Sequence, residues 1–517
     1  MKTSVHSDIV AHTRSTMARY ACALTVTIWL AAAGLAHAGI TDAVKFETLP
    51  NGLQVLLLEN HKAPVATFNV FYKVGSRNEQ FGKTGISHLC EHLMFRGTKK
   101  LKPEEFSNII QENGGQDNAF TESDLTDYFE VINRDHLDVP ISLEADRMAN
   151  FEPKGFDSEK AVVMEERRLR TDDNPEDALE ETTKAQSYLA AAYHWPVIGW
   201  MHDIEGLTLQ DALTYHGIYY SPQNALIVAV GDFDADKVMK QISESFGAIK
   251  NGAKPPPVTA EEPPQEGERH VVLRHAANLP AFAIGYHVPN YIRNPKDSFG
   301  LEVAGEILAE GKSSRLYKDL VVDKRMILDV DLGYDMTAFD PSLFWMSAQM
   351  RPGVKAEDAV AAIDKQITAL RDKPVSAQEL QKAKNLVQAQ FVFGQDSVFN
   401  EAMQLGIYQL LGDYRMLDQY LPGIDKVTAA DVQRVAKQYL LDSNRTVGVL
   451  VPTGILPHEQ GGGPARGAVS HAPMMDPSAE MLPPVASASD HMRALIGAAS
   501  LIGAASRGRD VPAGEVK

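Results

Sequence analysis

Two stretches of the 517-residue sequence share one pattern: TLQDALTYHGIYYSPQNALIVAV at residues 208–230 and TAADVQRVAKQYLLDSNRTVGVLV at residues 428–451. Each begins with Thr-x-x-Asp, continues through a Tyr to an Asn, and ends in an apolar run. All four matched residues are offset by 220 positions. Thr at a helix N-cap with an acidic residue three positions later predicts a helix, followed here by a turn and a buried strand. The shared order of elements indicates two homologous halves.

The first half carries the elements of a mixed fold. Residues 53–59 and 65–74 are rich in β-branched and aromatic residues, and they lie close enough in sequence to form a hairpin. Helical patterns follow at residues 86–96, 103–113 and 135–150. Strands in succession and then helices in succession favour an α+β fold over a doubly wound sheet. We therefore expect each half to contain a mostly antiparallel sheet covered on one face by helices.

The expected domain organisation follows from composition. The Pro-rich segment at residues 252–267 is typical of a stiff, solvated linker. It separates an N-terminal domain, residues 39–251, from a homologous C-terminal domain, residues 268–453. Residues 454–517 contain a Gly-Gly-Gly-Pro segment and a tandem Leu-Ile-Gly-Ala-Ala-Ser repeat. Such low-complexity composition cannot offset chain entropy by burial, so we expect a disordered tail.

Residues 1–38 have the features of a secretory signal peptide. Arg14 and Arg19 precede an apolar run at residues 21–35, and Ala-His-Ala at residues 36–38 fits a signal-peptidase site. The run is short and interrupted by Thr and Gly, which disfavours a stable membrane anchor, although an uncleaved anchor is the alternative. We expect an exported protein, periplasmic if the source is a Gram-negative bacterium.

Charge and cysteine content exclude several classes of protein. The chain has 68 Asp+Glu against 50 Lys+Arg, a formal net charge of −18, and 44% hydrophobic residues. A general nucleic-acid binder would need a strongly basic face, so no nucleic-acid partner is expected. The apolar fraction excludes disorder throughout. Cleavage after residue 38 would leave Cys90 alone, so the mature chain could form no intrachain disulfide.

The segment GISHLCEHLMFRG at residues 85–97 carries the pattern H-x-x-E-H. On a helix, His88 and His92 lie on one face, so both imidazoles can bind one metal ion. Glu91 lies beside them, where a carboxylate can accept a proton from a zinc-bound water. The alternative is that the three polar residues share a solvated helix face. The apolar neighbours disfavour a surface helix, and one cation would satisfy three buried polar groups.

A catalytic zinc normally has three protein ligands, and the segment at residues 157–169 offers the third. Helical spacing places five residues on one stripe: Glu159, Val162, Val163, Glu166 and Leu169. Glu165 belongs to a face that is expected to be wet. A carboxylate in an apolar stripe needs a cation, so we predict Glu166 as the ligand and Glu159 as its orienting or proton-handling companion. Two ordinary ion-paired glutamates are the alternative.

These motifs together resemble a known family. The segment at residues 85–97, NGGQDNAFT at residues 113–121 and the helix containing residues 159–166 are similar to the pitrilysin/insulinase family of zinc peptidases. The resemblance is strongest to the small bacterial members and to the β subunit of mitochondrial processing peptidase. It spans roughly residues 44–453.

The resemblance implies a site and a fold. It implies one Zn²⁺ per chain bound by His88, His92 and Glu166, with Glu91 as the base. Together with the helical pattern, this makes Glu91 and Glu159 the catalytic candidates. It also implies two homologous α+β halves that enclose a chamber for unfolded or short peptides.

The resemblance assigns a substrate-binding role to four residues: Asn118, Ala119, Phe120 and Thr121. In the family this segment is a sheet-edge strand beside the zinc, with which the peptide substrate pairs as an added strand. An ordinary strand with a turn-forming Asn is the alternative. His194 lies in a segment that is also similar to one near the family's site, and we expect it to be a hydrogen-bonded structural residue.

One departure from the family concerns the second half. Family members commonly have an Arg and a Tyr seven residues apart, which hold the substrate backbone and the oxyanion. The preceding Ser-Ser-Arg-Leu is present at residues 313–316, but Val321 and Leu328 occupy the two positions, and neither can donate a hydrogen bond. Arg315, Tyr317 and Arg325 are nearby, but the helical phasing would have to change for any of them to replace the pair.

The sequence therefore predicts a zinc endopeptidase that acts on peptides as the catalytic subunit of a heterodimer. Its partner would be a homologous chain that lacks H-x-x-E-H and supplies the Arg/Tyr pair. The alternative is a catalytically weak peptide-binding or assembly subunit of a peptidase-like complex.

Overall fold

The computed structural model describes residues 39–454. Residues 39–44, with the short 3-10 helix η1 (Ile40–Ala43), form a unit of their own, and both sheets belong to the unit that begins at Lys45. The predicted signal peptide, residues 1–38, lies outside the described residues, as does the predicted tail from residue 455 onward. Among residues 39–454, no helix combines the length and apolar character needed to cross a membrane.

The first sheet has six strands in the order β1-β2-β6-β3-β5-β4. They are β1 (Lys45–Thr48), β2 (Gln54–Glu59), β3 (Val65–Tyr72), β4 (Gln116–Thr121), β5 (Thr126–Asn133) and β6 (Ala225–Gly231). Only β2 and β6 pair in parallel, and every other neighbouring pair is antiparallel. The predicted hairpin of the first two apolar strands is wrong, because β6 lies between β2 and β3 and pairs with both.

The helices of the first half follow the predicted segments. They are α2 (Ile86–Leu93), α3 (Glu105–Glu112), α4 (Asp138–Ala149), α5 (Phe156–Arg167), α6 (Pro175–Ser187), α7 (Met201–Gly206), α8 (Leu209–Tyr219) and α9 (Ala235–Phe246). A π-helix, η4 (Arg168–Asp172), joins α5 to α6. Short 3-10 helices complete the half: η2 (Ser76–Asn78), η3 (Arg134–His136), η5 (Ala192–His194) and η6 (Pro222–Asn224).

The second sheet has five strands in the order β7-β11-β8-β10-β9. They are β7 (Arg269–His275), β8 (Ala281–Val288), β9 (Asp331–Tyr334), β10 (Ser342–Gln349) and β11 (Arg445–Pro452). Only β7 and β11 pair in parallel. The order and directions therefore match those of β2, β6, β3, β5 and β4 in the first sheet.

The helices of the second half lie between these strands in sequence. They are α10 (Pro295–Leu308), α11 (Ala356–Asp372), α12 (Ala377–Gly394), α13 (Val398–Leu411), α14 (Tyr420–Lys426) and α15 (Ala429–Tyr439). A π-helix, η7 (Tyr317–Asp323), follows α10, and two 3-10 helices, η8 (Tyr414–Gln419) and η9 (Asp442–Asn444), precede α14 and β11.

The 220-residue repeat corresponds to equivalent interactions in the two halves. Thr208 and Thr428 cap α8 and α15, and each forms a capping box with the Asp three residues later. The amide of Asn224 donates to the carbonyl of the matched Tyr and to that of Lys73 beside β3. The amide of Asn444 donates to its own matched Tyr and to the carbonyl of His287 in β8. Two homologous halves are therefore confirmed.

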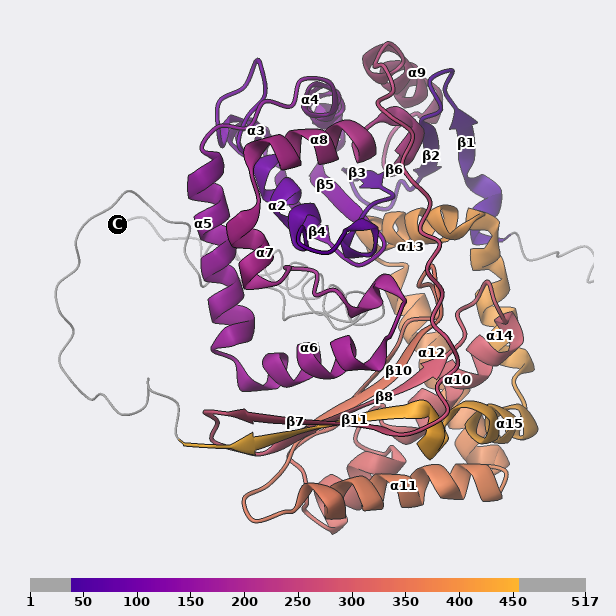
Figure 1. Ribbon diagram of the computed structural model, residues 1–517. Coiled ribbons are helices and arrows are strands. Elements are labelled where there is room, and N and C mark those ends of the chain that lie inside the picture. Colours follow the sequence, from indigo (N-terminus) through magenta and orange to yellow (C-terminus); the bar gives the residue numbers. More distant parts are fainter. Residues whose placement is uncertain (1–38, 455–517) are drawn as a thin grey trace, which may run out of the picture. The chain divides into compact units, whose positions relative to one another are not determined.

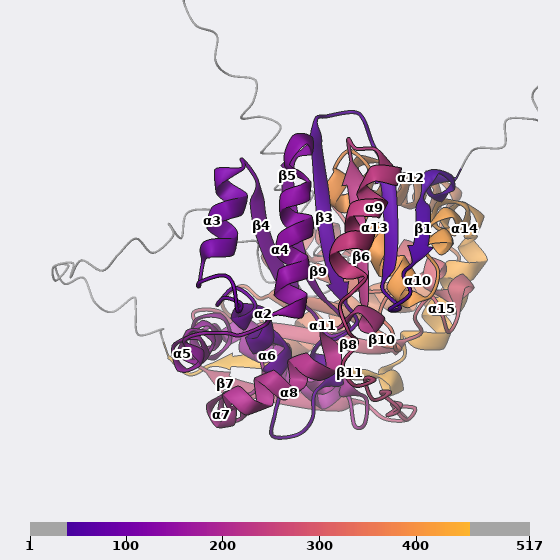
Figure 2. The same cartoon turned by 90° about the horizontal axis from the view of Figure 1, so that it is seen from above.

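Helices cover both faces of each sheet, whereas the sequence predicted cover on one face only. In the first sheet, α4 and α9 lie over one face (Figure 2), and α13 from the second half packs against β3 and β6 on the other. In return, α6 from the first half packs against β7, β8 and β11 of the second sheet (Figure 1). The one-face expectation fails because the central strands are apolar at nearly every position, so both of their faces are buried.

The helices α13 and α6, each packed on the sheet of the other half, are called the exchanged helices here. They approach those sheets closely at two glycines. Gly406 of α13 lies against the ring of Phe71 in β3, and a Cβ at this position would overlap that ring. Gly448 of β11 lies against Thr183 of α6, where a Cβ would overlap the hydroxyl. Each half therefore depends on a helix from the other half to complete its packing.

The predicted linker, residues 252–267, has no regular secondary structure. It nevertheless contacts the first half, because the carboxylate of Glu262 accepts hydrogen bonds from the backbone N–H groups of Leu189, Ala190 and Ala191 at 2.9–3.1 Å. The segment is thus held in place at this point.

The close contact of α13 with β3 can be tested by adding a methyl group. Gly406→Ala should lower the free energy of unfolding by about 1–3 kcal/mol, because the new Cβ overpacks the Phe71 ring. Gly217→Ala is the matched control, since a Cβ on this exposed glycine of α8 would have no neighbouring atom within 4 Å. It should stabilise the helix by about 0.5–1 kcal/mol. Urea denaturation measures both, and equal effects would contradict the packing.

Candidate metal centre

The helix that carries H-x-x-E-H is held at its first turn. Gly85 is the N-cap of α2 with φ of +82°, in the left-handed region that favours glycine. The buried carboxylate of Glu79 accepts hydrogen bonds from the N–H groups of Gly85 and Ser87, both at 2.8 Å. It thereby satisfies two N–H groups that a helix start leaves free. Burial raises the pKa of Glu79 to about 8. The sequence did not single out Glu79, although an acidic residue shortly before a helix start was a usable signal.

The structure brings His88, His92 and Glu166 together. Oε2 of Glu166 lies 3.7 Å from Nε2 of His88 and 3.4 Å from Nε2 of His92. One ligand atom from each residue lies within 4.8 Å of the other two, and the described residues contain no second group of this kind. Two imidazole nitrogens and one carboxylate oxygen are the ligands of a common catalytic zinc site, which leaves a fourth position for water. The donor set therefore fits Zn²⁺.

Glu159 holds the other nitrogen of His92. Its Oε1 lies 3.0 Å from Nδ1 of His92, and its Oε2 lies 3.2 Å from Nε of Arg96. A proton on Nδ1 leaves Nε2 free to face Glu166, which is the orientation that a metal requires. Glu159 thus lies where an orienting companion of the ligand group is needed.

The electrostatics of the group are those of a cation site. Burial, together with the neighbouring His92, lowers the pKa of His88 to about 3. Burial also opposes charge on His92, but its hydrogen bonds with Glu159 and Glu166 raise its pKa to about 10. Burial opposes ionisation of Glu166, yet its contacts with the two histidines lower its pKa to about 2. A divalent ion would take the place of the proton that His92 carries without it.

Glu91 lies beside the ligand group without belonging to it. Burial raises the pKa of Glu91. The hydroxyl of Thr121 donates to its Oε2 at 2.5 Å. A carboxylate with a raised pKa, held by one hydrogen bond, is suited to accept a proton from water and to pass it on.

The four predicted substrate-binding residues, Asn118, Ala119, Phe120 and Thr121, lie on β4. This strand forms one end of the first sheet and pairs only with β5 within residues 39–454. It also packs against α2. The helix α3 packs against β4 as well. The structure thus places these four residues on an edge strand, next to the Thr121 hydroxyl that contacts Glu91.

The predicted apolar stripe of α5 is largely wrong. Val163 is fully buried, but Val162 is 50% exposed and Leu169 is 65% exposed. The contact of α5 with α2 and α7 covers only a narrow face. After Arg167 the chain also changes into the π-helix η4, so regular helical spacing does not extend to Leu169. Glu166 nevertheless faces the two histidines.

Arg170 is a contact that the sequence did not single out. From η4, its Nη1 binds Oε1 of Glu166 at 2.8 Å, so the second carboxylate oxygen is also held. The four-residue spacing between the two residues was the available signal.

His194 lies outside the ligand group. Its Nδ1 donates to the carbonyl of Ala191 at 2.7 Å and its ring lies against that of Trp195, as expected for a structural residue.

The positions of the missing Arg/Tyr pair carry apolar side chains. Val321 packs against the core of the second half, and Leu328 is 39% exposed. Arg315 forms a bidentate pair with Glu379 of α12, at 2.7 and 2.8 Å, so its guanidinium is already engaged. Arg325 is exposed, with φ of +52°. The π-helix η7 changes the helical phasing between these positions.

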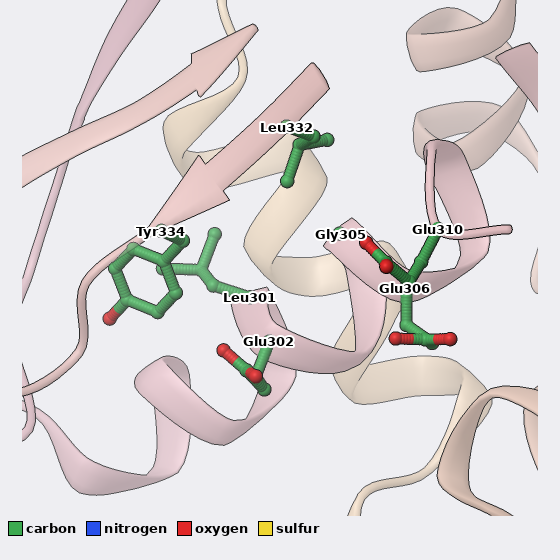
Figure 3. A pocket seen from close by; sticks show the side chains of 7 residues that line it. All are labelled: Leu301, Glu302, Gly305, Glu306, Glu310, Leu332 and Tyr334. Atoms are coloured by element: carbon green, nitrogen blue, oxygen red, sulfur yellow. The ribbon is translucent and has the colours of Figure 1, made fainter. Parts of the chain in front are cut away.

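A small cavity lies apart from the metal centre, in the second half (Figure 3). Its lining residues are Leu301, Glu302, Gly305, Glu306, Glu310, Leu332 and Tyr334. The three glutamates recur every four residues along α10 and the turn after it, so they share one side. No residue of the candidate metal centre lines this cavity.

The chain matches two family models in succession. Insulinase (Peptidase family M16) matches residues 54–198, and Peptidase M16 inactive domain matches residues 206–387. Zinc protease PqqE of Helicobacter pylori is 38% identical over 417 residues, which cover 78% of this chain and 92% of that protein. This protein belongs to the M16 peptidase family. The name of the second model agrees with the location of the ligand group, which among the described residues occurs only in the first half.

Further comparisons include one more sequence relative and two solved structures. An uncharacterized zinc protease of Bacillus subtilis, YmxG, is 22% identical over 417 residues, covering 80% of this chain and all of that protein. The crystal structure of a protease from Helicobacter pylori matches with a TM-score of 0.77 at 35% identity, covering 79% of this chain and 99% of that one. A peptidase M16 inactive domain from Pseudomonas fluorescens matches with a TM-score of 0.71 at 16% identity, covering 80% of this chain and 98% of that one.

The choice between two adjacent glutamates can be tested by metal analysis. Glu166→Gln should weaken Zn²⁺ binding by at least about 100-fold, beyond the 10–100-fold typical of outer partners, because an amide oxygen is a poor zinc ligand. Glu165→Gln is the matched control, since Glu165 is exposed and pairs with Arg168. Competition with a chromophoric chelator measures the affinity of both. Zinc lost from the Glu165 variant and kept by the Glu166 variant would reverse the assignment.

Proposed function

We propose that this protein is a zinc-dependent endopeptidase that cleaves short or unfolded peptides. The observation that carries the proposal is the geometry of one small region. His88, His92 and Glu166 converge on one point, Glu91 lies beside them, and the hydroxyl that holds Glu91 belongs to an open sheet edge. Membership of the M16 family, with relatives named zinc proteases, supports the same reaction class.

The residues of the site have distinct tasks in this reaction. His88, His92 and Glu166 would hold Zn²⁺, which when bound polarises the substrate carbonyl and lowers the pKa of a bound water to about 7. Glu91 accepts a proton from the attacking water and delivers it to the leaving amine. Its raised pKa helps the carboxyl group to hold that proton until the proton passes to the leaving amine. Glu159 keeps His92 in the required tautomer.

The substrate class follows from the open edge of β4. Backbone pairing with Asn118–Thr121 accepts an extended peptide of almost any sequence, and it places one backbone stretch next to Glu91. A folded protein offers few free extended segments, so short and unfolded peptides fit this edge best.

A second candidate function is a catalytically weak peptide-binding or assembly subunit. It is favoured by the side chains at the positions of the family's Arg/Tyr pair, because Val321 and Leu328 have no donor for an oxyanion. The pairing of Arg315 with Glu379 supports the same conclusion.

We also propose that a homologous chain without H-x-x-E-H completes the enzyme by supplying an Arg/Tyr pair. This heterodimer reconciles the complete ligand group with the missing donors. The signal-peptide pattern of residues 1–38 supports an exported, periplasmic location for the complex. Cys90 is the only cysteine after this segment and is buried, so the mature chain would form no intrachain disulfide in that compartment.

The base can be tested apart from the metal. Glu91→Gln should retain Zn²⁺, since Glu91 is outside the ligand group, but lose about 10²–10⁴-fold in kcat because an amide cannot accept the proton of water. Zinc content and cleavage of a fluorogenic peptide measure the two effects. Glu112→Gln, at the exposed end of α3, is the control and should change neither. Turnover near that of the unaltered protein would exclude Glu91 as the base.

The partner can be tested by reconstitution. The mature chain alone should bind Zn²⁺ yet cleave the peptide about 10²–10³-fold more slowly than the complex, which is the usual cost of a missing oxyanion donor. The activity should appear on adding a homologous chain that lacks H-x-x-E-H, and it should be lost when the Arg of that chain is changed to Ala. Full turnover by the mature chain alone would contradict the heterodimer and make Arg325 the candidate donor. No turnover in either state would favour the peptide-binding function.

A further inference from the structure

Arg167, the residue after Glu166, is a buried cation with several partners. Its side chain is only 5% exposed. Its guanidinium donates two hydrogen bonds to the carboxylate of Glu181, at 2.8 and 2.9 Å. It also donates to the carbonyl of Gly199 at 2.6 Å and lies 5.6 Å from the ring centroid of Trp200. One side chain therefore joins the end of α5, the helix α6 and the loop before α7.

The contact with Gly199 leads to the start of α2. Gly199 and Gly85 lie backbone to backbone, both with positive φ, and a Cβ on Gly199 would overlap the backbone of Gly85. The N–H of Trp200 donates to the hydroxyl of Thr84 at 2.9 Å, which ties the same loop to the residue before the N-cap. Because Gly85 lies three residues before His88, movement of this loop moves the first turn of α2, the helix that carries both histidines.

The contact with Glu181 leads to the second half. Glu181 belongs to α6, which packs on the second sheet (Figure 1). The imidazole of His275 in β7 donates to the carbonyl of Asp172 at 3.0 Å, and the amide of Gln349 in β10 donates to Glu176 at 2.7 Å. Glu181, which accepts the hydrogen bonds of Arg167, therefore lies on a helix that is held by the second sheet. That sheet carries no candidate metal ligand.

We propose that Arg167 and Glu181 form a positioning pair that sets the separation between Glu166 on α5 and the two histidines on α2. The inference rests on the proposed zinc peptidase function. The same guanidinium acts on both sides of the metal centre: it is adjacent to Glu166 in the chain, and it reaches the histidine helix through Gly199 and Gly85. The pair makes the second half, through α6, part of the support of the metal centre.

The chemistry of the pair suits positioning. A bidentate guanidinium–carboxylate contact fixes the plane of the guanidinium as well as its distance. Arginine can serve the carboxylate and a carbonyl at the same time, because its planar group has five N–H donors in a fixed arrangement, which lysine lacks. The carboxylate of Asp172 also lies near, with its Oδ1 3.4 Å from Nη2 of Arg167. Since the guanidinium is buried, loss of the Glu181 carboxylate would shift it towards Asp172 and away from its present position.

Changing Glu181 tests the pair without altering a metal ligand. In the full chain, Glu181→Gln should weaken Zn²⁺ binding by about 10–100-fold, the range found for groups that orient metal ligands. It should also change the visible absorption spectrum of the Co²⁺-substituted protein and lower kcat more than it changes KM, because the ligand geometry is altered while β4 is not. Glu180→Gln is the matched control, since the adjacent Glu180 pairs with Lys184 on the same helix. It should leave affinity, spectrum and kcat unchanged.

Glu181→Asp is a second variant, which keeps the test informative if Glu181→Gln does not fold. It keeps the negative charge that Arg167 requires but shortens the side chain, so it should fold and show a smaller loss of affinity with a changed Co²⁺ spectrum. If the folded variants bind Zn²⁺ like the unaltered protein and give its Co²⁺ spectrum, the pair is only structural and the proposal is overturned. If the unaltered protein itself binds neither ion, the proposed function fails and this inference fails with it, a result distinct from the first.

Discussion

The ionised carboxylate of Glu166, lying between the imidazoles of His88 and His92, is the interaction on which the rest of the site depends. Burial opposes a charge on each of these groups, so they can lie together only when opposite charges or a shared cation balance them. The three residues come from two helices, α2 and α5. Their arrangement therefore depends on whatever holds those helices, including Glu79 at the start of α2 and Glu159 beside His92.

Duplication has given the two halves one topology and different tasks. The first half carries the candidate ligands, and the second provides α13 against the first sheet and a sheet on which α6 rests. The contacts at Gly406 and Gly448 show how closely these exchanged helices pack. The second half, which carries no candidate ligand, thus still packs against α6, the helix that follows the segment containing Glu166 and Arg170. Because of this division of tasks, the second half can keep the fold of the first half without carrying metal ligands of its own.

Much of the fold and the ligand group could be predicted from local sequence. The 220-residue offset predicted equivalent caps and turns, because a capping Thr and a turn Asn act on residues only a few positions away. The four-residue spacing of His88 and His92 predicted a shared helix face for the same reason. Glu166 was preferred over Glu165 through a stripe that is only partly buried, yet it does face the histidines. The family resemblance added β4 as an edge strand.

Only the tertiary structure decided how distant segments meet. That β6 lies between β2 and β3, and that α6 and α13 pack on the opposite half, depends on contacts between segments that are far apart in the sequence. The contact of Arg167 with Gly199 likewise joins segments that no local pattern connects. Periodicity reports which face of an element is buried, but it does not identify the element that buries it. The π-helices after Arg167 and Leu316 also escaped prediction, because hydrogen bonds that span one more residue leave no signature in a pattern read at regular helical spacing.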